Sequence, residues 1–517
     1  MRFTTPRRAV LASTLAIALL SSSQAWSEEE SRDNDDLFAD LSQPITSLPY
    51  LSSLKGIAET QHYQAPSIYS LKNEHQVRTL FAPTQGLPVV DIQLTFNAGS
   101  ARDNTIRGEL NGLASLTAQL LDEGTSKYNA TQIAATFEML GAQFSAQAYR
   151  DMFIVKLRVT ADNQRLEPAL SLLLEILKDT QFRQSNIDLI LNNASVGQQQ
   201  TKENPSRLLG IRFYRAVYGS HPYAAPTTGT QRTLSLIKPD DIQNFKNRYL
   251  VNNNLNIAIT GQLTRDQATT IANAITRVLP QGEKAPPLAQ PTPIQGQKVF
   301  HVPFDSSQSH VMMGHLGVTR NHPDRLALEV ANTMLGGSGF NSLLMRELRV
   351  KRGYTYGAYS QFNFTQATGL FSLSYSTRND HLIPSIRVTH QTLKNFVQQP
   401  IDLKALEDTK KGMLRAFPSS ISSNAAINAQ LGLIGFYGLP DDHLSQYPIQ
   451  LQRLSAIDIQ RAIQTYFKPD QLVTVIISPT LDKVQVQNIL QSAPDTLPAS
   501  QSNDPFIGLE PISSDDE

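Results

Sequence analysis

The feature that most constrains the fold of this 517-residue chain is a long internal repeat. Phe153 and Asp162, which close a predicted strand, recur 218 positions later as Phe371 and Asp380. In both copies a stretch with the apolar periodicity of an amphipathic helix follows. A repeat of this length is far longer than the period of a solenoid. It predicts an α+β protein of two homologous domains, each with a mixed, mostly antiparallel sheet covered by helices.

Composition along the chain predicts where these domains begin and end. The segment 279–296 holds five prolines and shows no clear periodicity, so we interpret it as a linker between two domains. It separates a first domain, 66–278, from a second domain, 297–492. We expect 28–65 to be a polar lead-in and 493–517 to be a disordered acidic tail.

The first 27 residues have the pattern of a secretory signal peptide. Three arginines precede the apolar run 9–20, which is too short to span a bilayer. Cleavage is expected after Ala25 or Ser27, and the alternative is a segment that stays uncleaved as an anchor. The chain has no cysteine, so it forms no disulfide and offers no site for a bacterial lipid anchor. These features predict a location in a bacterial periplasm, with no membrane span after signal removal.

The charges of the chain are balanced. Lysine plus arginine and aspartate plus glutamate each number 45, so the formal net charge is zero. A nucleic-acid-binding protein usually carries an excess of basic residues. We therefore expect no nucleic-acid partner.

The residues 111–125 read Asn-Gly-Leu-Ala-Ser-Leu-Thr-Ala-Gln-Leu-Leu-Asp-Glu-Gly-Thr. Leucines at helical spacing predict a helix with one buried face, which Gly124 would end. Ser115 and Gln119 would share one face of it, with Ala118 beside them. In frame, the stretch resembles the zinc-binding helix of the insulinase/pitrilysin family of metallopeptidases, whose inverted motif is His-x-x-Glu-His.

Ser115, Ala118 and Gln119 stand where the family has His, Glu and His. A catalytic zinc needs three protein ligands, and a hydroxyl and an amide are poor replacements for two imidazoles. Ala118 cannot accept a proton from a bound water. The family's third ligand is a Glu on a later helix, here predicted near 186–200, and no acidic residue occurs in 189–202. The resemblance thus implies a subunit without a metal or cofactor of its own.

Three other side chains near these motifs could ligate a metal. Asp122 and Glu123 follow the predicted helix, but adjacent side chains point apart, and we expect both to be solvated. His221 lies in the loop 218–229, which resembles another signature of the same family. Because His221 has no partner at ligand spacing, we interpret it as part of the loop structure.

The run Leu-Leu-Met-Arg-Glu-Leu-Arg-Val-Lys-Arg-Gly-Tyr-Thr-Tyr at 343–356 resembles the family's second-domain signature, Leu-x-x-x-Leu-Arg-Glu-x-x-Gly-Leu-x-Tyr. The match puts Arg349 and Tyr356 on the family's Arg/Tyr pair, although the motif's Glu and last Leu are replaced. The resemblance implies that the pair binds the substrate carbonyl across a closed chamber. A guanidinium and a phenol are strong donors suited to that role. The alternative is that Arg349 pairs with Glu347 or another acid and Tyr356 only packs.

Taken together, the motifs imply one clam-like, two-domain half of a peptidase. We expect a periplasmic, non-catalytic subunit of a heteromeric zinc metallopeptidase, inactive alone, in a heterodimer or a larger assembly. A homologous partner would bear the zinc, and this chain would contribute Arg349 and Tyr356 to metalloendopeptidase activity. Peptide substrates would bind as an added strand along a sheet edge. The alternatives are a stand-alone peptide-binding or chaperone-like module and an assembly scaffold.

Overall fold

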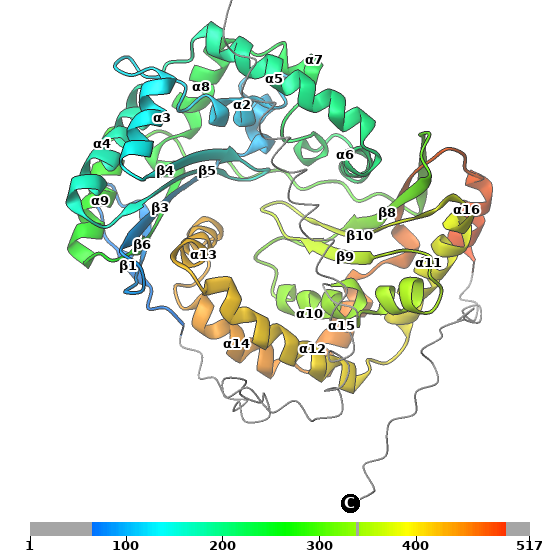
Figure 1. The fold of residues 1–517 in the computed structure, drawn as a ribbon. Coiled ribbons are helices and arrows are strands. Elements are labelled where there is room, and N and C mark those ends of the chain that lie inside the picture. Colours follow the sequence, from blue (N-terminus) through cyan, green and yellow to red (C-terminus); the bar gives the residue numbers. More distant parts are fainter. Residues whose placement is uncertain (1–64, 338–340, 493–517) are drawn as a thin grey trace, which may run out of the picture. The chain divides into compact units, whose positions relative to one another are not determined.

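The computed structural model describes residues 65–337 and 341–492 (Figure 1). The predicted signal peptide, nearly all of the predicted lead-in and the predicted acidic tail lie outside the described residues. Within the described ranges, no helix is both long enough and apolar enough to cross a membrane.

The first half of the described chain is built on a six-stranded sheet in the order β1-β2-β6-β3-β5-β4. All neighbouring strands are antiparallel except β2 and β6, which are parallel. The strands are β1 (Tyr69–Leu71), β2 (Arg78–Pro83), β3 (Val89–Phe96), β4 (Gln143–Ala148), β5 (Phe153–Thr160) and β6 (Leu255–Gly261). The helices are α2 (Leu113–Gln119), α3 (Ala130–Met139), α4 (Asn163–Asp179), α5 (Gln184–Glu203), α6 (Pro205–Tyr218), α7 (Gln231–Leu234), α8 (Pro239–Tyr249) and α9 (Arg265–Val278).

The second half repeats this plan with a five-stranded sheet in the order β7-β11-β8-β10-β9. Its one parallel pair, β7 and β11, corresponds to β2 and β6, so the predicted twofold repeat is confirmed. The strands are β7 (Lys298–Pro303), β8 (Gln308–Leu316), β9 (Ala358–Asn363), β10 (Leu370–Arg378) and β11 (Val473–Ser478). The helices are α10 (Arg325–Gly336), a π-helix (Met345–Val350), α11 (Leu382–Gln398), α12 (Leu403–Ala416), α13 (Asn424–Tyr437), α14 (His443–Arg453), α15 (Ala456–Tyr466) and α16 (Lys483–Gln491).

Each sheet is built from strands in which buried and more exposed side chains alternate, and amphipathic helices cover the buried side chains. Along β5 the side chains of Phe153, Val155, Leu157 and Val159 are buried and the residues between them are more exposed. This period of two turns one row of side chains toward α4, which buries its own leucine-rich face against the sheet. Figure 1 shows α4 and α9 on the same face of the first sheet.

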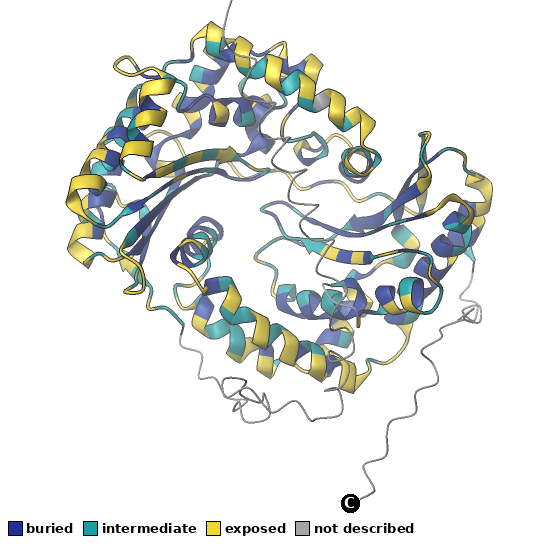
Figure 2. Ribbon diagram, viewed as in Figure 1, coloured by how far each residue is buried: buried dark blue, intermediate teal, exposed yellow. Residues whose placement is uncertain are grey.

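The opposite face of the first sheet is covered by α13, a helix from the second half (Figure 1). Most of α13 is buried (Figure 2), as its apolar composition on all sides predicts. A row of small and amide residues lets it approach the sheet closely. The Nδ2 atom of Asn428 donates to the carbonyl oxygens of Asp91 (3.0 Å) and Ala258 (3.1 Å). At Gly432 a Cβ atom would collide with the amide of Gln93.

The second sheet is covered in the same way by a helix from the other half. Helix α6 of the first half packs on β8 and β11 of the second sheet. Leu209, Phe213 and Val217 of α6 are buried in one cluster with Val475 and Ile477 of β11. The two halves therefore exchange one helix each. In each sheet, a helix from the other half covers part of one face.

Both exchanged helices end in a tyrosine that reaches a hairpin turn of the other half. The hydroxyl of Tyr218 donates to the carbonyl oxygen of Thr368, at 3.2 Å, in the β9–β10 turn. The hydroxyl of Tyr437 lies 3.5 Å from the carboxylate of Asp151, in the β4–β5 turn. The two turns also meet directly, since the backbone N–H of Gln366 donates to Asp151 at 2.8 Å.

We expect Asn428→Ala to lower the free energy of unfolding by about 1–3 kcal/mol, because it removes the donor of two hydrogen bonds in a buried interface. The measurement is equilibrium denaturation in urea. Asn193→Ala on the exposed face of α5 is the matched control and should change stability by less than about 0.5 kcal/mol. Equal effects at the two positions would show that α13 does not depend on this contact.

Candidate functional site

The short helix α2 is held at its start by a buried carboxylate. Asp103 accepts hydrogen bonds from the backbone N–H groups of Gly112 (2.7 Å) and Ala114 (2.8 Å). Burial raises the pKa of Asp103 to about 8, against these N–H groups, which favour the carboxylate. Gly112 has a φ of +101°, and a Cβ there would lie 2.9 Å from the Cα atom of Gly229. The loop 218–229 thus packs directly against the start of α2.

Ser115, Ala118 and Gln119 all lie on α2, as predicted, but their surroundings do not fit a catalytic zinc. The Nε2 atom of Gln119 donates to the carbonyl oxygen (3.2 Å) and the hydroxyl (3.3 Å) of Ser115. The two side chains that replace the imidazoles therefore bond to each other. Ala118 is only 2% exposed, so it packs where the family has its catalytic base.

The helix α2 ends sooner than predicted, and the residues after it are less solvated than predicted. Its last residue is Gln119, and Gly124 instead forms a β-bridge with Asn129. Asp122 and Glu123 are half-buried, and burial raises the pKa of both, so the prediction that both are solvated is wrong. The chain turns directly after α2, and this turn brings the backbone of Asp122 and Glu123 toward α5.

The helix α5 lies beside this turn, and its Asn186 donates to the carbonyl oxygen of Glu123 at 2.7 Å. The resemblance implies that this is the helix that carries the third zinc ligand in the family. Its residues 189–202 contain no acid, as the sequence shows. Over the described residues, no three His, Cys, Asp or Glu side chains gather into a group that could hold a metal ion.

His221 belongs to the structure of its loop, in agreement with our interpretation. Its Nδ1 atom accepts from the backbone N–H of Tyr223 at 3.2 Å, and its Nε2 atom lies 2.8 Å from the carbonyl oxygen of Ala289. Burial lowers the pKa of His221. Both ring nitrogens are therefore engaged, and the ring connects the loop to the segment between the halves.

The signature in the second half forms a π-helix, Met345–Val350, around a buried ion pair. Glu347 is 5% exposed and its carboxylate accepts from Lys351 (2.7 Å) and Arg352 (2.8 Å). Burial alone would raise the pKa of Glu347, but the hydrogen bonds and charges of these two residues outweigh it and lower that pKa. A π-helical turn is rare and occurs often at functional sites. Sequence reasoning missed this pair, because the motif's own Glu is replaced by Val350.

Arg349 and Tyr356 lie together, as the resemblance implied. The guanidinium of Arg349 donates to the carbonyl oxygen of Tyr356 at 2.9 Å. Tyr356 is 86% exposed, so its side chain is open to a ligand. The alternative was that Arg349 pairs with Glu347 or another acid. The carboxylate of Glu347 instead pairs with Lys351 and Arg352.

The two sets of candidate residues belong to different halves of the chain. The π-helix packs against α11 and β9, whereas α2 packs against α8 and β4. The positions that the resemblance assigns to the metal thus lie in one half, and Arg349 and Tyr356 lie in the other.

Comparison with known proteins identifies the family. The model "Insulinase (Peptidase family M16)" matches residues 79–231, and "Peptidase M16 inactive domain" matches 237–413. A crystal structure of a peptidase M16 inactive domain from Pseudomonas fluorescens is 32% identical, with a TM-score of 0.76, and the match covers 80% of this chain and 98% of that one. The chain belongs to the insulinase (M16) family.

Two further relatives agree with this assignment. A Helicobacter pylori protein named "Non-peptidase homolog YmxG" is 24% identical over 410 residues, which cover 78% of this chain and 93% of the relative. The crystal structure of a protease from Helicobacter pylori shares the fold, with a TM-score of 0.73 at 20% identity, and covers 80% of this chain and 100% of that one. This chain is an inactive, peptidase-like member of the family.

Restoring the helix motif alone should not create a zinc site. We expect the variant with Ser115→His and Gln119→His to bind zinc only weakly, because a catalytic zinc needs a third protein ligand, which α5 lacks. Adding Ala118→Glu should destabilise the fold, since that position is buried. Elemental analysis after dialysis measures the zinc, and one retained zinc per chain in the double variant would contradict this prediction.

Glu347→Gln should destabilise the second half, because it removes the carboxylate charge that pairs with the buried guanidinium of Arg352. Breaking a buried pair costs about 3–5 kcal/mol. The matched control is Glu109→Gln, which removes an exposed pair with Arg232 and should cost less than about 1 kcal/mol. Thermal unfolding measures both, and the prediction fails if Glu347→Gln unfolds like the control.

Proposed function

We propose that this chain is the non-catalytic subunit of a periplasmic, heteromeric zinc metallopeptidase that degrades or processes peptides. A homologous partner subunit would bear the zinc. This chain would contribute Arg349 and Tyr356 and part of the wall around the substrate. The signal-peptide pattern of the first 27 residues supports the periplasmic location.

The observation that carries the proposal is a difference between the two candidate sites: one has lost the residues of the family's motif, and the other has kept its Arg and Tyr. The zinc positions are occupied by Ser115, Ala118 and Gln119, whereas the donors Arg349 and Tyr356 are kept. A scaffold has no need for a guanidinium held next to the backbone of an exposed tyrosine. A subunit that binds the substrate carbonyl does, because charge develops on that oxygen during peptide cleavage.

The geometry of the pair suits this task. The π-helix and the Glu347–Arg352 ion pair fix the backbone from which Arg349 extends. The bond from Arg349 to the carbonyl oxygen of Tyr356 fixes the backbone that carries the second donor, whose side chain is exposed. A guanidinium that is already held in place needs little reorganisation when a substrate arrives.

The edges of the sheets offer a place for the peptide backbone. In the first sheet β4 is an edge strand without proline or charged residues, and it lies beside α2. In the second sheet β9 is an edge strand that begins two residues after Tyr356. Unpaired edges of this kind accept an extended peptide as an additional strand.

In the reconstituted complex, we expect Arg349→Ala to leave assembly intact and to slow peptide cleavage about 10²–10³-fold, the usual effect of losing one such donor. Tyr356→Phe should have a smaller effect, because a neutral donor is weaker than a charged one. The measurement is steady-state cleavage of a quenched peptide, with assembly checked by size exclusion.

The matched control for Arg349 is Arg346→Ala on the same π-helix. Arg346 is half-exposed and its Nε atom lies 3.8 Å from Glu347, so its loss should be nearly neutral. Arg352 is not a suitable control, because its side chain is 5% exposed and holds Glu347. If Arg349→Ala and Arg346→Ala both cleave at the wild-type rate in an assembled, active complex, the chain is a scaffold.

A further inference from the structure

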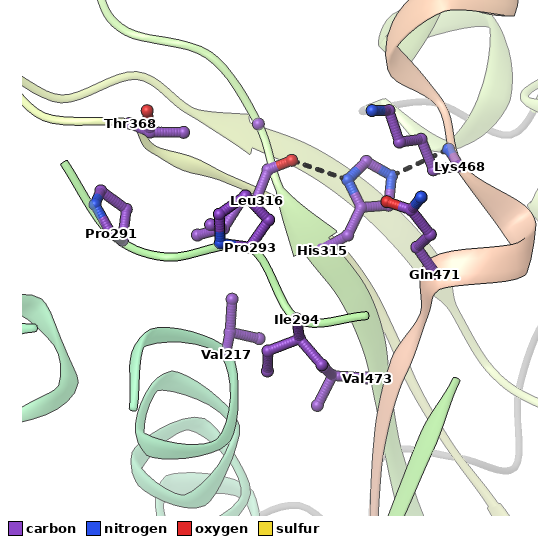
Figure 3. A pocket seen from close by; sticks show the side chains of 11 residues that line it. Val217, Pro291, Pro293, Ile294, His315, Leu316, Thr368, Lys468, Gln471 and Val473 are labelled. Carbon is purple, nitrogen blue, oxygen red and sulfur yellow. Dashed lines mark hydrogen bonds between the residues drawn. The ribbon is translucent and has the colours of Figure 1, made fainter. Parts of the chain in front are cut away.

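A pocket of about 260 Å³ lies where the first half, the segment between the halves and the second sheet meet (Figure 3). Its lining comes from the end of α6, from Pro291–Ile294, from the end of β8 and from the turn that leads into β11. It does not include α2, the π-helix or Tyr356. It is therefore separate from the site described above.

One side of the pocket is apolar. Val217 and Val473 are buried members of one hydrophobic cluster, and Ile294 packs against that cluster. Figure 3 shows these three side chains on the side of the pocket away from the imidazole of His315. Such a surface favours an aliphatic group of a ligand.

The other side of the pocket is polar and is arranged by His315. The Nε2 atom of His315 accepts from the backbone N–H of Lys468 at 3.1 Å, so the ring proton resides on Nδ1, which donates to the carbonyl oxygen of Leu316 at 2.9 Å. The ring is neutral and both nitrogens are engaged, and burial lowers the pKa of His315 to about 4. It cannot act as an acid or base toward a ligand. It fixes the backbone that carries Lys468.

The charge of the polar side is positive. Lys468 is exposed at this side and Gln471 follows it, and Figure 3 shows both side chains grouped around the imidazole. None of the described residues that line the pocket is acidic, so the ammonium group of Lys468 meets no carboxylate there. Thr368, the other polar side chain, already bonds to Gln290 at 2.8 Å. The pocket thus offers one positive charge and one amide opposite an apolar surface.

We propose that this pocket binds a small aliphatic carboxylate. The aliphatic group lies between Val217, Ile294 and Val473, and the carboxylate bonds to the ammonium group of Lys468 and the amide of Gln471. The ligand is small, because the volume lies below the ~300–1,000 Å³ of sites for drug-sized molecules. A free carboxylic acid and the C-terminal residue of a peptide share this chemistry.

The test is isothermal titration of the full chain with N-acetyl-leucine and with N-acetyl-leucinamide, which differ only in the negative charge. We expect saturable binding of the acid and at least about tenfold weaker binding of the amide, because a charge-assisted hydrogen bond is lost. A tetrapeptide ending in leucine, with a free or an amidated C-terminus, distinguishes the two sources. Tight binding of the free tetrapeptide assigns the pocket to peptide ends, and binding of only the small acid assigns it to free acids.

Two variants connect this binding to the pocket. Lys468→Met keeps the length of the side chain and should weaken binding of N-acetyl-leucine about tenfold, whereas Lys483→Met on the exposed face of α16 should not change it. Ile294→Trp fills the apolar side and should abolish binding. The proposal is overturned if acid and amide bind equally, if neither binds, or if Lys468→Met binds like the wild type. None of these outcomes depends on a partner subunit, so they do not bear on the proposed function.

Discussion

The buried carboxylate of Asp151 is the contact on which the relation between the two halves depends. Its oxygens accept from the hydroxyl of Tyr223 in the first half and from the N–H of Gln366 and the hydroxyl of Tyr437 in the second. Such a group is costly to leave without partners, because burial has removed its water. It sits where the exchanged helix α13 ends and where the two hairpin turns meet. The contact thus connects the end of one exchanged helix to the hairpin turns of both halves.

The fold was predictable where a local pattern determines it. In the strand β3 (Val89–Phe96) apolar residues alternate with Asp91, Gln93 and Thr95, and this period of two indicates a strand. The exchange of α6 and α13 was not predictable, since no local pattern says which sheet a helix will cover. The early end of α2 was missed because a glycine occurs in turns and bridges as well as at helix ends, and Gly124, at a φ of +145°, lies in a β-bridge beyond the helix.

The candidate site was predictable as a set of positions but not as a set of interactions. The helical period placed Ser115 beside Gln119, and their side chains do bond to each other. The motif placed Arg349 with Tyr356, but no pattern indicated that Arg349 would bond to the backbone carbonyl of Tyr356. Nor did any pattern indicate that Glu347 would form a buried ion pair with Arg352 at the π-helix. These interactions depend on burial, which a single sequence does not reveal. They hold the backbone of the Arg349 and Tyr356 segment in place while the hydroxyl of Tyr356 stays exposed.

The central claim is that this chain is half of a peptidase whose metal is carried by another subunit. The most direct measurement is isolation of the full chain, at its native level, from the cells that make it, with zinc and subunit content determined by native mass spectrometry. The account predicts a homologous subunit at a fixed ratio, zinc bound only to that subunit, and chelator-sensitive peptide cleavage by the complex alone. Recovery of this chain by itself, with one tightly bound zinc and peptidase activity of its own, would contradict the account.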